Sequence, residues 1–175
     1  DFGGEVERVL SMVDSVLLLV DAVDGPMPQT SFVTKKALEA GLCPIVVINK
    51  VDRDGARPDW VLDQTFDLFD KLGANETQLD FPVVYASAIY GWATNDYIDK
   101  KNNMDAIFDT IIKNVPYPNV DPNSNFQMQI SALSYSSYVG LVGTGRIRRG
   151  NLKKGQNVSI GNENGNVRQG KVLQI

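Results

Sequence analysis

The sequence predicts an α/β domain with a mostly parallel sheet, followed by a smaller antiparallel β domain. Through residue 115, apolar runs typical of buried strands alternate with segments whose apolar residues recur at helical spacing, as in parallel sheets covered by helices. Three prolines then occur within residues 116–122, and the short alternating runs that follow are separated by glycines. We therefore expect one domain over residues 1–115, a linker over 116–124 and a β domain over 125–175.

Apolar periodicity in the first domain predicts four helices and three strands. The helices are marked by apolar residues within 6–13, 33–40, 62–69 and 104–112, and the strands by the runs 15–21, 45–48 and 83–86. Gly41 is expected to end the second helix, and Pro116 to limit the fourth. We interpret all four helical stripes as core. Residues 91–103 are polar and irregular, which predicts a surface loop that partly buries Trp92 and Tyr97.

The second domain has the pattern of short antiparallel strands. Residues 126–132 alternate apolar and polar side chains, as expected of a half-buried strand. Seven glycines between residues 140 and 165 then separate short apolar runs. This pattern predicts a small antiparallel barrel. Because roughly 50 residues are few for a closed barrel, we expect only its first part.

Composition narrows the class of protein. The net charge of −4 argues against a general polycationic nucleic-acid binder. The single cysteine cannot form an internal disulfide, and no apolar run approaches the ~20 residues that a membrane-spanning helix needs. We expect a soluble, cytoplasmic protein with no membrane partner.

Two short polar segments follow apolar strands and predict a base-binding site. Asn49-Lys50-Val51-Asp52 follows the run 44–48, and Ser87-Ala88 follows the run 82–86. Open α/β sheets bind ligands beyond the carboxyl ends of their strands, where both segments are expected to lie. The two segments together indicate recognition of guanine.

Donor and acceptor counting supports guanine over adenine. The Asp52 carboxylate only accepts hydrogen bonds, and guanine presents adjacent N1–H and N2–H donors that it can take together. We expect Asn49 to brace the loop, the aliphatic stem of Lys50 to lie along a purine face, and the Ala88 N–H to donate to guanine O6, with the small Ser87 allowing close approach. The alternative is ordinary turn chemistry, because Asn and Asp are common in loops and helix starts.

Three stretches resemble the translational GTPases: DFGGEVERVL at 1–10, LLVDAVDGPMPQT at 18–30 and IVVINKVDR at 45–53. The first points to the BipA/TypA family of ribosome-associated translational GTPases, and GRIRRGNLKKG at 145–155 resembles the second β-barrel domain of such proteins. One departure is Ser31, where the family pattern has an arginine. The resemblance implies the fold of a P-loop GTPase domain followed by part of an antiparallel β-barrel domain.

The same resemblance implies a parent protein that hydrolyses GTP to GDP and phosphate, uses Mg²⁺, and binds ribosomal RNA and ribosomal proteins. The family's phosphate loop carries Gly-Lys-Ser or Gly-Lys-Thr, which these 175 residues lack, and they contain no histidine to position water. We therefore expect a truncated P-loop GTPase domain without phosphate loop and switch I. Such a fragment should have no catalytic residue, no metal ligand and no tightly bound GTP, GDP or Mg²⁺.

Two further expectations concern partners. The densest basic cluster comprises Arg146, Arg148, Arg149, Lys153 and Lys154, which are candidate contacts to RNA phosphates. The same charges would also serve to protect an exposed hairpin from edge pairing, and the sequence favours neither reading. If the family's phosphate-loop strand is missing, the strand at 15–21 has an unpaired apolar edge, and the fragment is expected to self-associate there.

Two functions from different classes remain. The chain is either the guanine-recognition and second-domain portion of a GTP-hydrolysing, ribosome-associated regulator of translation and stress, or a nucleotide-independent binding module that acts through its β domain. A phosphate loop encoded upstream would favour the first.

Overall fold

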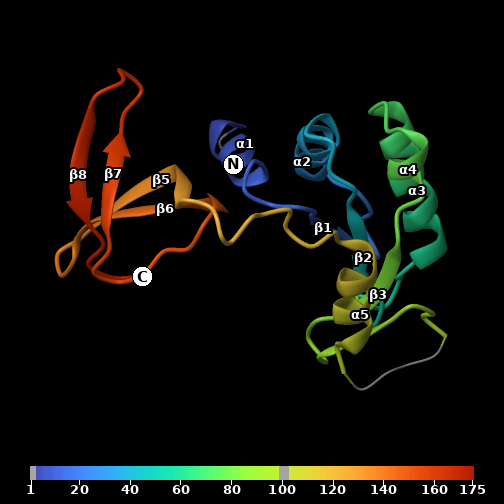
Figure 1. Cartoon of the computed structure of the whole chain (residues 1–175). Coiled ribbons are helices and arrows are strands. Elements are labelled where there is room, and N and C mark those ends of the chain that lie inside the picture. Colours follow the sequence, from blue (N-terminus) through green and yellow to red (C-terminus); the bar gives the residue numbers. More distant parts are fainter. Residues whose placement is uncertain (1–2, 99–102) are drawn as a thin grey trace. The chain divides into compact units, whose positions relative to one another are not determined.

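The computed structural model describes residues 3–98 and 103–175 and divides into two compact units, 1–117 and 118–175 (Figure 1). Residues 1–2 of the first resembling stretch and residues 99–102 of the expected loop lie outside the described residues. Within the described ranges, no helix has the length and apolar character required to cross a membrane.

Unit 1 is built on a four-stranded sheet in the order β1-β2-β3-β4. The parallel strands are β1 (Leu17–Asp21), β2 (Ile45–Asn49) and β3 (Val83–Ser87), and β4 (Trp92–Thr94) pairs antiparallel with β3. The prediction of a mostly parallel sheet is confirmed. The prediction of a loop over residues 91–103 was wrong at its start, where Trp92–Thr94 form β4. A strand of three residues is too short to show the alternation that identifies strands in a sequence.

Five helices accompany this sheet among the described residues: α1 (Gly3–Leu10), α2 (Pro28–Glu39), α3 (Pro58–Lys71), α4 (Glu76–Leu79) and α5 (Asp105–Asn114). Proline opens α2 and α3, where its missing N–H costs no helical hydrogen bond. Gly41 follows α2 with a φ of 76°, a conformation that suits glycine after a helix. The short α4 was not predicted; a reciprocal capping box between Asn75 and Gln78 stabilises its start.

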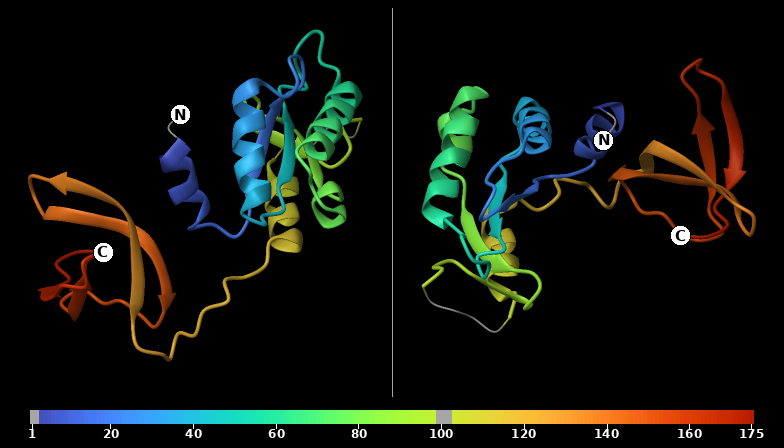
Figure 2. Two further views of the ribbon diagram at one scale, coloured as in Figure 1. Left: turned by 90° about the horizontal axis from the view of Figure 1, so that it is seen from above. Right: turned by 180° about the vertical axis from the view of Figure 1, so that it is seen from behind.

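Helices α2 and α3 pack against one face of the sheet, and α5 packs against part of the other (Figures 1 and 2). Leu38 of α2 and the α3 residues Val61 and Phe69 belong to one buried cluster with the strand residues Leu18, Val20, Val46, Ile48 and Tyr85. On the other face, Ile107 of α5 packs against Val47, Val84, Ala86 and Ala93. The loops that follow β1, β2 and β3 are thus carried by a rigid, buried scaffold.

All four predicted core stripes are only partly buried. In the first, Leu10 of α1 is buried but Val9 is 48% exposed, and in the second, Ala40 just after α2 is exposed. On α3 the buried residues are Val61, Thr65 and Phe69, whereas Phe66 is 47% exposed. Thr65 is accommodated inside because its hydroxyl donates to the Val61 carbonyl at 2.7 Å. On α5, Phe108 and Ile112 are 59% and 79% exposed. The interpretation of these exposed apolar residues as core was wrong, because each lies outside the face that its helix buries.

Unit 2 contains two separate antiparallel pairs. One pair joins β5 (Gln127–Ser136) to β6 (Gly140–Arg149), and the other joins β7 (Asn157–Gly161) to β8 (Val167–Lys171). The antiparallel prediction is confirmed. A Cβ at Gly145 would lie 1.9 Å from the Gln129 carbonyl oxygen, so the close approach of β5 and β6 there requires glycine.

Candidate functional site

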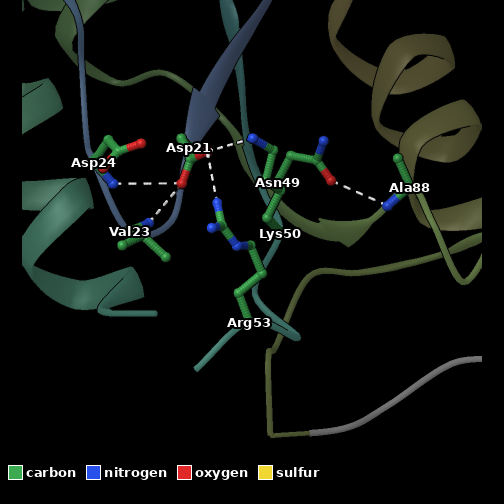
Figure 3. A network of polar contacts seen from close by, with 7 residues as sticks. All are labelled: Asp21, Val23, Asp24, Asn49, Lys50, Arg53 and Ala88. Atoms are coloured by element: carbon green, nitrogen blue, oxygen red, sulfur yellow. Dashed lines mark hydrogen bonds and ion pairs between the residues drawn. The ribbon is translucent and has the colours of Figure 1, made fainter. Parts of the chain in front are cut away.

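The carboxyl ends of β2 and β3 bring the two predicted polar segments together. Asn49, the last residue of β2, lies opposite Ala86, the next-to-last residue of β3, in the parallel register. The Asn49 side-chain oxygen accepts a hydrogen bond from the Ala88 N–H at 3.1 Å (Figure 3). This bond joins the end of β2 to the loop after β3. The Ala88 N–H, the expected donor to guanine O6, would have to exchange or share this bond to serve a base.

Ser87 contributes a buried hydroxyl at the same edge. The residue has 0% exposure, and its Oγ has no hydrogen-bond partner among the residues that the structure describes. An unsatisfied buried hydroxyl is costly, by about 1–3 kcal/mol, and is rare enough to indicate a functional position. Sequence reasoning valued Ser87 only for its small size; the structure adds a donor close to the loop after β2.

Lys50 has an unusual backbone. Its φ of 66° is the only positive value of a non-glycine residue within the described ranges. Such conformations cost about 1–3 kcal/mol and persist where surrounding contacts hold them, commonly at ligand sites. The Lys50 ammonium donates to the Asp21 carboxylate at 2.6 Å (Figure 3). The loop after β2 is therefore tied to the end of β1 as well as to β3.

Asp21 was missed by sequence reasoning. It ends β1 opposite Asn49, so a comparison of the predicted strand ends could have found it. Its Oδ1 accepts from the amides of Val23 at 2.8 Å and Asp24 at 3.4 Å, and Arg53 lies 3.8 Å from Oδ2. Burial alone would raise the pKa of Asp21, but the hydrogen bonds from Lys50 and the two amides hold this pKa below its ordinary value. The carboxylate is therefore charged at neutral pH.

Asp52 stands in the turn after β2 with its carboxylate exposed. No hydrogen bond or ion pair engages this carboxylate within residues 3–98 and 103–175. Both oxygens are thus available to accept from a ligand. Because Asp52 is exposed, the desolvation that disfavours a wrong base would arise only when a base covers the carboxylate.

The predicted basic cluster of unit 2 is divided between two places. Arg146, Arg148 and Arg149 are on β6, whereas Lys153 and Lys154 follow the strand and line an open hollow together with Ser124, Asn125, Asn151 and Gln156. Lys153 and Lys154 therefore lie beside side chains that carry amide and hydroxyl groups. Both earlier readings, RNA contact and edge protection, still apply to the arginines on β6.

Comparison with known proteins identifies the family to which unit 1 is similar. Residues 1–117 match the family described as the elongation factor Tu GTP binding domain. The chain belongs to this family. The elongation factor Tu GTP binding domain match covers the ends of β1, β2 and β3, and therefore Asp21, Asn49 to Asp52, Ser87 and Ala88.

Curated relatives match the whole chain. It is 62% identical to the large ribosomal subunit assembly factor BipA of Escherichia coli strain K12, 61% to that of Haemophilus influenzae and 59% to that of Buchnera aphidicola from Schizaphis graminum, each over all 175 residues. The resemblance to BipA is confirmed. The chain spans 29%, 28% and 29% of the length of these relatives, respectively.

Proposed function

We propose that unit 1 reads guanine for a GTPase of which this chain is one part. The observation that carries the proposal is the unpartnered Asp52 carboxylate, presented at the carboxyl edge of the sheet in a GTP-binding domain family. Guanine offers the two adjacent donors that this carboxylate can accept, and adenine does not. The buried Ser87 hydroxyl and the Asn49–Ala88 hydrogen bond lie at the ends of the two neighbouring strands and support a ligand site at this edge.

The wider proposal concerns the full-length protein. It would bind GTP and GDP with Mg²⁺, hydrolyse GTP, act in the cytoplasm and associate with the ribosome, in keeping with relatives named large ribosomal subunit assembly factors. Residues 1–115 would be the carboxyl-terminal portion of its GTPase domain, 116–124 a linker, and 125–175 the start of its second domain. The lysine-lined hollow of unit 2 supports contact between that second domain and RNA phosphates.

Nucleotide competition in the full-length protein tests this function. A fluorescent guanine nucleotide should be displaced by GTP and GDP, while ATP at the same concentration leaves it bound. Equal displacement by ATP would remove base recognition from the loop after β2. Salt-sensitive RNA binding without any nucleotide effect would instead favour the module that acts through its β domain.

The 175-residue chain alone is expected to bind GDP no better than millimolar and to hydrolyse no GTP above background. It lacks the phosphate-loop motif, and each charge-assisted phosphate contact contributes roughly 1.5–3 kcal/mol. Isothermal titration calorimetry with GDP, and phosphate release with GTP, would check both statements. Micromolar GDP binding by this chain would contradict them.

The same chain is expected to self-associate through β1. Among the described residues this strand pairs only with β2, and its Leu17 and Leu19 side chains are 43% and 62% exposed. Exposed apolar edges recruit further strands. Light scattering should report species larger than a monomer, and Leu19→Lys should reduce their amount. The control is Leu133→Lys, at a residue of β5 in unit 2 that is 66% exposed, which should reduce their amount less. A monodisperse monomer with a cooperative melt would count against this proposal.

A further inference from the structure

Three neighbouring strand ends are joined by side chains at the candidate site. Asp21 ends β1 and lies opposite Asn49 of β2, which in turn lies opposite Ala86 of β3. The Asp21 carboxylate receives the Lys50 ammonium, and the Asn49 side chain receives the Ala88 N–H (Figure 3). Asn49, the last residue of β2, is thus attached to the loop after β3, and Lys50, which follows it, is attached to the end of β1.

We propose that Asp21 is a positioning residue for nucleotide recognition: by holding Lys50, it fixes the loop that presents Asn49 and Asp52 to the base. This inference rests on the proposed guanine-binding function. Asp21 itself would not touch the nucleotide. Its effect would pass through Lys50, whose backbone is in the left-handed region that a lysine rarely adopts.

The environment of Asp21 suits this role. The Asp21 side chain is 15% exposed, whereas that of Lys50 is 50% exposed. The surrounding protein therefore holds the carboxylate in place, and the ion pair holds the lysine side chain. The Val23 and Asp24 amides orient the carboxylate from the loop after β1. Arg53, 3.8 Å away, is the second cation near the same oxygen. The carboxylate would thus keep its place even when the lysine is removed, which allows the two groups to be tested separately.

Asp21→Asn is the direct test, measured in the proposed full-length GTPase. The amide keeps the shape and can still accept from the Val23 N–H, but it loses the charge that holds Lys50. GDP affinity should fall by about tenfold, a usual effect for one charge-assisted hydrogen bond. The preference for guanine over adenine nucleotides should fall by a similar factor without being reversed, because the Asp52 carboxylate is still present but less well positioned. Asp24→Asn is the matched control, since only the backbone amide of that exposed residue takes part.

A double-mutant cycle separates positioning from a general structural role. Lys50→Met keeps the aliphatic stem and removes the ammonium. If Asp21 acts through Lys50, Asp21→Asn should change GDP affinity by less than about twofold in the Lys50→Met background. An equal loss in both backgrounds, or no loss in either, would overturn the proposal.

The contact can also be tested without nucleotide in the 175-residue chain. Nitrogen-15 NMR at mildly acidic pH should detect slowed proton exchange of the Lys50 ammonium, which Asp21→Asn removes and Asp24→Asn leaves. Unchanged exchange in Asp21→Asn would overturn the inference. If exchange behaves as expected but the full-length protein does not discriminate GDP from ADP, then the proposed function fails while the Asp21–Lys50 contact stands, and the positioning role is overturned with the function.

Discussion

Replacing Phe69 by alanine is expected to lower the free energy of unfolding of unit 1 by about 3–5 kcal/mol. Phe69 has 0% exposure, and its ring centroid lies 4.7 Å from that of Phe81. It joins α3 to the sheet cluster that includes Val46 and Ile48. Truncation would remove the favourable transfer free energy of the buried ring and leave a cavity between α3 and the sheet.

Phe66 supplies the matched control on the same helix. It is 47% exposed, so Phe66→Ala should cost less than about 1 kcal/mol. Urea unfolding at low protein concentration, followed by tryptophan fluorescence, would report on unit 1, because both tryptophans of the chain, Trp60 and Trp92, lie there. Equal losses in the two variants would contradict the burial pattern of α3.

Asp52→Asn is expected to weaken GTP binding of the proposed full-length GTPase by about 2–4 kcal/mol. The substitution replaces one acceptor oxygen with an amide donor, which would face the exocyclic amine of guanine. Displacement of a fluorescent guanine nucleotide would measure the loss.

Asp54→Asn is the control for charge and turn chemistry. Asp54 is an exposed aspartate two residues farther along the same turn. Its substitution should change GTP affinity by less than about 0.5 kcal/mol. If Asp52 were only a turn or capping residue, its substitution would cost about 1 kcal/mol of stability and leave nucleotide affinity unchanged. Similar GTP affinities in the two variants would therefore favour the turn interpretation.

Much of the scaffold was predictable because its strands are short, continuous apolar runs. The runs at 45–48 and 83–86 became β2 and β3, each extended by one residue, and their parallel pairing brings Asn49 and Ala88 together. Helix faces were less predictable. Thr65 is buried in place of Phe66 because a local hydrogen bond satisfies its hydroxyl, which no hydrophobic pattern reveals.

The missed part of the candidate site consists of contacts between segments distant in sequence. Asp21 and Lys50 are 29 residues apart, and only the parallel register places them at one edge. The positive φ of Lys50 is equally hidden, because lysine carries no preference for that conformation. The burial of the Ser87 hydroxyl depends on packing around the end of β3. Such features depend on tertiary structure, whereas sequence motifs and hydrophobic periodicity describe only neighbouring residues.

The base preference of Asp52→Asn in the proposed full-length GTPase tests the guanine site most directly. Xanthine has a carbonyl where guanine has its 2-amino group, so the new amide of the variant can donate to it. Competition among GTP, ATP and xanthosine triphosphate should show the wild-type protein preferring GTP and Asp52→Asn preferring xanthosine triphosphate. An unchanged preference for GTP in Asp52→Asn would contradict the account and remove Asp52 from the site.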